Sequence, residues 1–417
     1  MEPALEPEFI FLCALVRPHP DHRRALELAG DGLNFAHVER LAAAHGVRPH
    51  LLSALNACAG AEEFDELLKS LQCFWRAHAA RNLYAAGEIG RIANCFDRSG
   101  IGFATFKGVA LAATLYGDIS RREFNDIDII VRPSDLDAAE SALESCGYRA
   151  AQGNGRAWRE AFLGYQRQYV FVRRDSTLAV DLHWDFFPHD FLFPLDASEI
   201  WRRLDQVSIA GRTATTLDPE TLALYLIGHG AKEGWKSLGW VCDIADLYVR
   251  RPEVDWAGLF RRSDRGGRAR LQVGLLLAAK LLGVGVREEL LDDARGNATI
   301  ESQFDFALRR LAEAAELRDQ RAEFALAGAG IYRSLSEKAR SLWLLAVTRT
   351  ASDYDAIPLP RPLWRLYHVL RPFRLALKIA MLRIAAQEPK EPSQSAALGG
   401  ATPVRRIDAV RDEIGRG

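Results

Sequence analysis

Three aspartates lie in two segments that the sequence pattern predicts to be β-strands. Polar and apolar residues alternate along 126–131 (DIDIIV), so Asp126 and Asp128 project from the same face. Asp181 lies in 178–184 (LAVDLHW), where the same alternation separates it from the apolar face. Carboxylates on one face of neighbouring strands are suited to hold one or two divalent cations.

Metal ions held in this way assist the attack of an oxygen nucleophile on phosphorus. One cation lowers the pKa of the attacking hydroxyl, and the other neutralises a triphosphate and its leaving pyrophosphate. Oxygen ligands with no cysteine nearby favour Mg²⁺ or Mn²⁺ over zinc. We therefore expect Asp126, Asp128 and Asp181 to be catalytic metal ligands, although an Asp-x-Asp pair alone also describes a strand end with two solvated carboxylates.

Positive charge precedes these carboxylates in the chain. Lys107-Gly108 follows a short predicted strand (101–106) and begins an apolar helix, which places a cation and backbone N–H groups where a triphosphate would lie. Arg121 and Arg122 follow in the loop that leads to the Asp-x-Asp strand. Arginine both compensates carboxylates and binds phosphate, so both roles stay open for this pair. We expect Lys107, Gly108 and Arg122 to bind the nucleotide.

Histidine and tryptophan residues around this region have alternative interpretations. His183 shares the face of Asp181, which predicts contact with the nucleotide or with the carboxylate; the alternative is a partly exposed strand histidine. His229 lies on an apolar helix face, which favours packing over catalysis. Trp235 and Trp240 have the spacing of core residues at helix ends, so we favour a core role over stacking on a base.

The elements that must position these residues form a small sheet between helical regions. Apolar residues at steps of three and four predict helices up to about residue 97 and again from about 217. Between them, two strands flank the turn 174–177 as a hairpin, and a helix with Ser134 as its N-cap is expected over 134–145. We predict an α+β fold with a small mixed-sheet core flanked by N- and C-terminal helical regions.

The predicted organisation has four parts. They are an N-terminal helical region (1–99), an α/β core (100–212), a C-terminal helical domain (213–386) and a disordered tail (387–417). The tail is assigned from its content of Pro, Gly, Ser and charged residues. Further helices are expected over 240–249, 269–282, 302–327 and 334–348.

The candidate site residues resemble the minimal nucleotidyltransferase superfamily, and within it a bacterial branch of uncharacterised nucleotidyltransferases. The resemblance rests on Lys107-Gly108, Tyr116-Gly117-Asp118, Arg122, Asp126-Ile127-Asp128, Gly147-Tyr148 and Asp181-Leu182-His183-Trp184. It covers about 100–200 closely and the helices that follow more loosely. In the superfamily the paired carboxylates bind the metals, and the third completes the site and helps to activate the acceptor. The resemblance implies these roles for Asp126, Asp128 and Asp181.

One segment departs from the broader superfamily. Gly-Ser or Gly-Gly usually follows the first strand, whereas this chain has Lys107-Gly108-Val109 and a longer gap before the paired carboxylates. The bacterial branch shares the Lys-Gly form. The way in which better-known relatives hold the triphosphate therefore does not transfer directly to this chain.

The resemblance implies a Mg²⁺-dependent (or Mn²⁺-dependent) nucleotidyltransferase. Such an enzyme moves a nucleoside monophosphate from an NTP to a hydroxyl or phosphate acceptor and releases pyrophosphate. The acceptor classes it implies are a small molecule, a peptide, a sugar or a protein. Two alternatives stay open: a non-catalytic nucleotide-sensing or partner-binding module, and a phosphotransferase that uses the same metal site to move the γ-phosphate.

Composition and charge indicate a cytoplasmic protein that is not built around binding nucleic acid. The chain has 417 residues, 48% of them hydrophobic, and a net charge of −1, so it carries no general excess of cations for binding nucleic acid. Six cysteines without a CxxC pair predict reduced thiols in the cytoplasm. The acidic N-terminal stretch is unlike a secretory signal, and no apolar run reaches the roughly 20 residues of a membrane span.

The near-zero net charge of the whole chain masks a basic segment near the C-terminus. Residues 361–386 contain six cations and no acid, so the rest of the chain carries a net charge of −7. This pattern predicts contact with a partner or an anionic membrane surface, or else a terminal helix pair packed on the core with arginines at its rim. We favour the packed helix pair. The acidic body makes a polyanionic acceptor less suitable.

Overall fold

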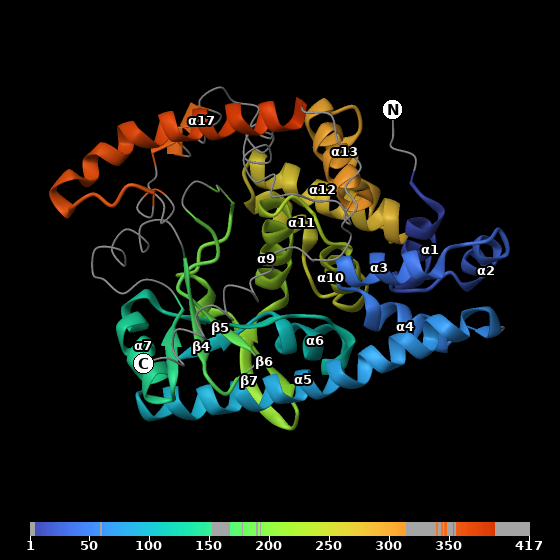
Figure 1. Cartoon of the computed structure of the whole chain (residues 1–417), viewed down its shortest axis with the longest axis horizontal. Helices are drawn as coiled ribbons and strands as arrows, with labels where there is room; N and C mark the ends of the chain where they lie inside the picture. The colour runs from blue at the N-terminus through green and yellow to red at the C-terminus, as the bar shows by residue number, and fades with distance from the viewer. Residues whose placement is uncertain are drawn as a thin grey trace.

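A five-stranded mixed sheet forms the centre of the protein (Figure 1). The computed structural model describes residues 5–58, 61–151, 167–176, 178–188, 191, 193–313, 339–340, 343–344, 346–347, 353 and 356–387. The strand order is β1-β2-β5-β4-β3. These strands are β1 (Phe103–Thr105), β2 (Asp126–Val131), β3 (Tyr148–Ala150), β4 (Gln168–Arg173) and β5 (Ala179–His183). With the helices on either side in sequence, this architecture confirms the predicted α+β class.

Helices precede, interrupt and follow the sheet. The N-terminal helices are α1 (Pro7–Val16), α2 (His22–Gly30), α3 (Phe35–His45), α4 (Arg48–Asn56) and α5 (Asp65–Arg98). Within the sheet region lie α6 (Gly108–Tyr116), η2 (Ile119–Arg121), η3 (Pro133–Asp135) and α7 (Leu136–Ser145). A separate hairpin of β6 (Leu204–Ile209) and β7 (Arg212–Leu217) leads into α9 (Pro219–Lys232), α10 (Leu238–Arg250), α11 (Trp256–Arg262), α12 (Arg265–Leu282) and α13 (Ala298–Ala312).

The register of the sheet brings the two carboxylate strands together. β2 and β5 are parallel neighbours, and Asp128 lies directly opposite Asp181, while Asp126 lies opposite Ala179. β4 and β5 form the predicted antiparallel hairpin, with Gln168 opposite His183. Because residues aligned across parallel strands project to the same face, the carboxylates of both strands point to one side of the sheet.

Two apolar cores hold the sheet between helices. The smaller core joins α5 and α7 to the sheet, and it contains the alternate apolar residues of the carboxylate strands, such as Ile127, Ile129 and Val180. The larger core joins the N-terminal helices α1–α4 to the C-terminal helices α9–α13. In Figure 1, α5 runs below the sheet and the C-terminal helices gather above it. The helices before and after the sheet therefore share one apolar core, and the division into four parts stays a prediction.

Helix ends follow the local sequence signals in some places and not in others. As predicted, Asp218 caps α9 by accepting from the N–H groups of Glu220 and Thr221, with Pro219 in the first turn. The prediction that Ser134 caps the helix expected over 134–145 was wrong. The chain first makes the 3₁₀ turn η3, and the helix, α7, begins at Leu136. Helix α13 ends at Ala312, and the rest of the helix expected over 302–327 lies mainly outside the described residues. The same holds for most of the helix expected over 334–348 and for the tail after 387.

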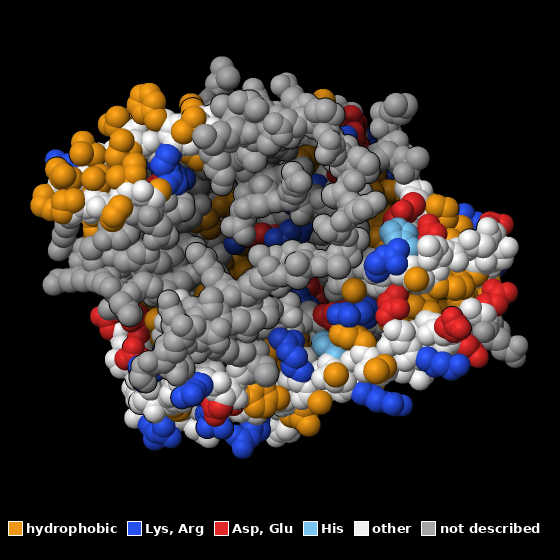
Figure 2. Space-filling model, in the orientation of Figure 1, with side chains coloured by type: hydrophobic (Ala, Val, Ile, Leu, Met, Phe, Trp, Pro, Cys, Tyr) orange, Lys and Arg blue, Asp and Glu red, His pale blue; other side chains and the backbone are white. Residues whose placement is uncertain are grey.

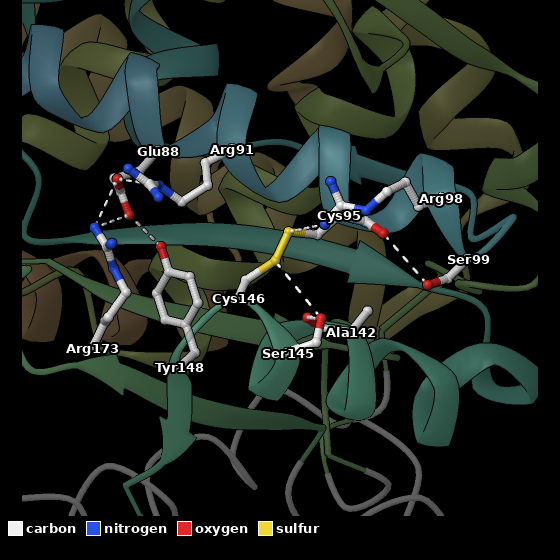
Figure 3. Close-up of a disulfide and its surroundings, with 10 residues drawn as sticks. All are labelled: Glu88, Arg91, Cys95, Arg98, Ser99, Ala142, Ser145, Cys146, Tyr148 and Arg173. Atoms are coloured by element: carbon white, nitrogen blue, oxygen red, sulfur yellow. Dashed lines mark hydrogen bonds and ion pairs between the residues drawn. A yellow bond between two sulfur atoms is a disulfide. The ribbon is translucent and has the colours of Figure 1, made fainter.

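Two of the six cysteines form a disulfide, so the prediction of reduced thiols throughout was wrong. Cys95 lies on α5, and Cys146 follows the last turn of α7, which packs on α5 (Figure 3). A second contact tightens the same region, where Glu88 of α5 binds Arg173 and the hydroxyl of Tyr148. The fold pairs two cysteines that are 51 residues apart, a proximity that their spacing in the sequence does not reveal.

We expect reduction of this disulfide to lower the free energy of unfolding by about 2–4 kcal/mol, because the cross-link restricts the unfolded chain. Urea unfolding with and without a phosphine reductant measures the change, and Cys146→Ser should reproduce it. Cys73→Ser, at an exposed free cysteine, is the matched control and should leave the unfolding curve unchanged. Identical curves for the wild type in both conditions would contradict the prediction.

The basic C-terminal segment forms the 3₁₀ helix η7 (Arg361–Leu366) and α17 (Tyr367–Gln387). One face is packed: Trp364 and Tyr367 are buried, and the guanidinium of Arg371 binds Asp353 at 2.5 Å. The other face exposes large apolar side chains, which Figure 2 shows gathered over α17. They are Leu363, Leu366, Val369, Phe373 and Leu377. The segment is thus only partly packed: the favoured packed helix pair describes the buried face, and contact with a partner or a membrane surface stays an alternative prediction for the exposed face. Within the described part of the chain, no helix is both long and apolar enough to span a bilayer.

Candidate active site

The carboxylates of Asp128 and Asp181 converge with the imidazole of His183 on one face of the sheet. One ligand atom from each of these three buried residues lies within 4.8 Å of the others, which is close enough to share a metal ion. Asp126, two residues before Asp128 on β2, is half-buried beside them. The three predicted carboxylates therefore come together, and His183 adds a fourth polar group that could ligate a cation.

The two carboxylate oxygens of Asp128 have different surroundings. Oδ1 accepts hydrogen bonds from Lys107 Nζ and His183 Nε2, both at 3.0 Å. Oδ2 is buried and has no hydrogen-bond partner among the described residues. A buried carboxylate oxygen without a donor is costly, and such an atom marks a place for a missing water, ion or ligand. The donor set and the unpartnered oxygen both fit a divalent cation at this position.

Burial and mutual repulsion shift the pKa values of the carboxyl groups apart. Burial, then the charge of Asp128, raise the pKa of Asp126 to about 6. Burial and the charges of the other two carboxylates raise the pKa of Asp181 well above its ordinary value. Burial alone would raise the pKa of Asp128 too, but Lys107 and the hydrogen bond from His183 hold it well below the usual range. The raised pKa values of Asp126 and Asp181 show that the carboxylates repel one another, which a bound divalent cation would relieve.

Lys107 and Gly108 join the end of β1 to the carboxylates. The Lys107 ammonium also forms a hydrogen bond with the Tyr225 hydroxyl of α9. Burial alone would lower the pKa of Lys107, but Asp128 and Tyr225 raise it well above the ordinary value. Gly108 begins α6 with a positive φ of 50°, and a Cβ there would lie 3.3 Å from the carbonyl oxygen of Asp126. Only glycine therefore lets the N-terminus of α6 approach the start of β2 this closely.

Arg122 reaches a partner on the C-terminal helices. Its guanidinium binds the carboxylate of Asp243 on α10 through two hydrogen bonds of 2.9 Å, from Nε to Oδ1 and from Nη2 to Oδ2. The Asp243 side chain is 1% exposed and that of Arg122 12%. Arg122 is still close enough to lower the pKa of Asp126. The Nε and Nη2 groups of Arg122 are thus occupied by a structural ion pair. The positive charge of the side chain still contributes to the electrostatic potential at the carboxylates.

Comparison with known proteins agrees with this geometry. A family model described as "Uncharacterised nucleotidyltransferase" matches residues 31–283, more than half of the chain. The chain belongs to this nucleotidyltransferase family. No curated protein and no solved structure matches it. The match spans all five strands of the sheet and the helices α9 and α10, so every residue of the candidate site lies within it.

The structure of this nucleotidyltransferase adds residues to which the sequence interpretation gave no role. Gln168 Nε2 donates to Asp181 Oδ2 at 2.5 Å and fixes that carboxylate from β4. Lys232, at the end of α9, is half-buried and paired with Glu233; its partial desolvation lowers its pKa, and its charge acts on both His183 and Lys107. The hairpin register could have suggested Gln168, because it faces His183. No local signal in the sequence indicates that Lys232 lies near His183 and Lys107, which are far earlier in the chain.

The aromatic residues largely take the packing roles that we favoured. Trp235 is 3% exposed, and its ring lies against Gly230 and Gly274 of the nucleotidyltransferase. Trp240 is half-buried and meets the imidazole of His229 edge-on, with 4.8 Å between ring centroids. Burial lowers the pKa of His229 well below its ordinary value, so this imidazole is neutral in the folded protein. His229 packs between aromatic rings and carries no charge to the site.

The raised pKa of Asp126 predicts how the stability of the metal-free nucleotidyltransferase depends on pH. The folded protein keeps this proton up to about pH 6, whereas an unfolded chain releases it near 3.8. Stability is therefore lost as the pH rises from about 4 through 6, and the loss of order 1–3 kcal/mol is complete above that range. Asp126→Asn removes the ionisation, so the variant should be more stable than the wild type at about pH 8 and closer to it at about pH 4.5.

Urea unfolding in a chelator at both pH values measures this difference. Asp175→Asn is the matched control, because the Asp175 side chain is 71% exposed in the turn between β4 and β5. It should show no comparable gain at the higher pH. A variant at position 126 that is less stable than the wild type at about pH 8 would refute the predicted sign.

Proposed function

We propose that the chain is a Mg²⁺-dependent nucleotidyltransferase, with Mn²⁺ as a substitute, that transfers a nucleoside monophosphate from an NTP to a hydroxyl or phosphate acceptor. The observation that carries the proposal is the convergence of Asp128, Asp181 and His183, with Asp128 Oδ2 buried and unpartnered, in a member of a nucleotidyltransferase family. A bound Mg²⁺ would supply Lewis-acid stabilisation of charge on the phosphates.

Asp126, Asp128 and Asp181 are the residues that would hold the cations. Asp128 offers Oδ2 directly, and Asp181 lies opposite it on the neighbouring strand. His183 positions Asp128 by donating to Oδ1, and this contact supports an indirect role in nucleotide binding. Carboxylate oxygens are the preferred ligands of Mg²⁺, which favours them over the imidazole as first ligands.

Asp181 is also the best candidate for accepting the proton of the acceptor hydroxyl. Burial and neighbouring carboxylates raise its pKa, and a general base works best when its pKa is near the working pH. Gln168 holds one of its oxygens, which leaves the other to meet the acceptor. Asp181 would therefore complete the site and take the proton as the oxygen attacks the α-phosphorus.

The triphosphate would lie beside Lys107 and the first turn of α6. Lys107 supplies a fixed positive charge, and the N–H groups at the start of α6, from Gly108 onward, are donors for phosphate oxygens. Arg122 and Lys232 add positive potential near the carboxylates and His183. The surrounding helices would contact the acceptor, for which a small molecule, a peptide, a sugar and a protein remain the candidate classes.

Pyrophosphate release tests the proposal. Purified protein is mixed with each NTP and Mg²⁺, and the signal is compared with that of an Asp126→Ala/Asp128→Ala variant. We expect release by the wild type and none by the variant. Equal release by both proteins would contradict the proposal, and production of ADP without pyrophosphate from ATP would assign the site to γ-phosphate transfer instead.

A further inference from the structure

A pocket of about 220 Å³ lies away from the carboxylates, where the N-terminal helices meet η2 and α10. Its wall comes from the end of α1, the loop into α2, one face of α4, η2 and the last turns of α10. The lining residues are Leu15, Val16, Arg17, Pro18, Pro20, His22, His50, Ser53, Ala54, Ala57, Arg121, Asp246 and Arg250. None of them belongs to the candidate active site.

The lining has more positive than negative charge. Three arginines and one aspartate face the pocket, and the aspartate, Asp246, is already bound to Arg250 Nε at 2.6 Å. Arg17 donates to the carbonyl oxygen of Leu282 and forms a longer ion pair with Asp21. Arg121 differs: among the described residues it forms no ion pair, its Nη1 donates to Ser53, and its Nε is buried without a hydrogen-bond partner. Arg121 therefore lacks an anionic partner in the part of the chain that the structure describes.

His50 adds a second polar atom without a partner to the same pocket. Its Nε2 lies 3.1 Å from the hydroxyl of Tyr116 and shares a hydrogen bond with it. Burial, together with nearby arginines, lowers the pKa of His50 to about 3 and keeps the ring neutral. Its Nδ1 is buried and has no hydrogen-bond partner among the described residues.

We propose that this pocket binds a small molecule that carries an oxyanion, either a phosphate or a carboxylate, and a neighbouring hydroxyl. The oxyanion accepts from Arg121 Nε, and the hydroxyl pairs with His50 Nδ1. A hydroxyl can donate to a bare ring nitrogen or accept from a protonated one, so it satisfies Nδ1 in either tautomer, and the oxyanion supplies the counter-charge for Arg121. The volume is below the roughly 300–1,000 Å³ of pockets for drug-sized ligands, so the molecule is small.

The pocket is separate from the nucleotide site but connected to it. Arg121 points toward Ser53 on α4, whereas the next residue, Arg122, binds Asp243 on α10. Tyr116 links the two sides, since its hydroxyl contacts His50 and hydrogen-bonds to Asp243. A ligand in the pocket would therefore touch residues one step from the Arg122–Asp243 pair and would leave the carboxylates open to an NTP.

Calorimetric titration of the full chain tests the inference with matched probes. Glycerol 3-phosphate and glycerate represent the two sources of the oxyanion, and propyl phosphate has the same carbon skeleton as the first without its hydroxyls. We expect one-site binding of at least one hydroxylated anion. If that anion is the phosphate, propyl phosphate should bind about tenfold more weakly because it leaves His50 unpartnered.

Two variants locate the binding. Arg121→Gln removes the charge, and Ala57→Phe fills the pocket from the exposed end of α4; each should weaken binding about tenfold or more. Arg261→Gln, at a surface arginine 71% exposed, should leave it unchanged. Three results would each overturn the inference: no binding by the wild type up to about 10 mM, binding that survives both pocket variants, or binding lost in Lys107→Gln but kept in both pocket variants, which would place the anion at the nucleotide site.

Discussion

Replacing Asp128 by asparagine is expected to slow pyrophosphate release by at least about 10³-fold. A metal ion contributes several kcal/mol of transition-state stabilisation, and each loss of about 1.4 kcal/mol is a factor of ten in rate. The substituted amide keeps the shape and still accepts a hydrogen bond from Lys107 or His183, which now both donate to Oδ1. It loses the negative charge and turns one oxygen of the candidate metal site into an NH₂ donor. The effect should therefore fall on the rate much more than on the fold.

Initial rates of pyrophosphate release at saturating NTP and Mg²⁺ measure this loss. Asp175→Asn makes the same chemical change at an exposed turn and should keep the wild-type rate. Far-ultraviolet circular dichroism of both variants checks that the fold is intact. If Asp128→Asn retains more than about a tenth of the wild-type rate, Asp128 is not a ligand of a catalytic metal.

The largest expected loss of stability follows from removing Asp243. Its carboxylate is the bidentate partner of Arg122, and the pair joins the loop before β2 to α10, 121 residues further along the chain. Asp243→Ala leaves a nearly buried guanidinium without its counter-charge. Breaking a buried ion pair in this way costs about 3–5 kcal/mol, so we expect the free energy of unfolding in urea to fall by that amount.

A double variant separates the loss of the pair from the loss of a charge. Arg122→Met/Asp243→Leu removes both charges and keeps apolar volume, so it should be more stable than Asp243→Ala alone. Glu289→Ala breaks an exposed ion pair with Arg287 and should cost less than about 1 kcal/mol. A loss for Asp243→Ala no larger than that of Glu289→Ala would show that the buried pair does not hold these regions together.

The sequence predicted that Asp126 and Asp128 share one face because strand alternation is a local signal. The place of Asp181 beside them rested on the resemblance, because its strand β5 meets β2 through a parallel pairing of segments far apart in the chain and not through the β4–β5 hairpin. The Lys-Gly junction was also visible as a strand-to-helix turn. The Asp126/Asp128 pair and the Lys-Gly junction need only the period of a strand and a short connection, so both can be predicted without knowledge of the tertiary packing.

The contacts that the sequence did not reveal all join distant segments. Nothing near Arg122 indicates that Asp243 is its partner, and nothing near Cys95 indicates Cys146. Lys107 was expected to bind the triphosphate, and its contacts with Asp128 and with Tyr225 of α9 were not foreseen. Partner choice across the core depends on how helices pack, and composition and periodicity carry no information about that packing.

Direct measurement of metal binding tests the central claim without requiring the acceptor. Mn²⁺ titration followed by electron paramagnetic resonance counts the bound ions with and without a non-hydrolysable NTP analogue. The account predicts binding by the wild type that the analogue strengthens, and loss of that binding in Asp128→Asn. Mn²⁺ that remains free with the wild type, or that binds the variant equally well, would contradict a metal-dependent nucleotidyltransferase site at these carboxylates.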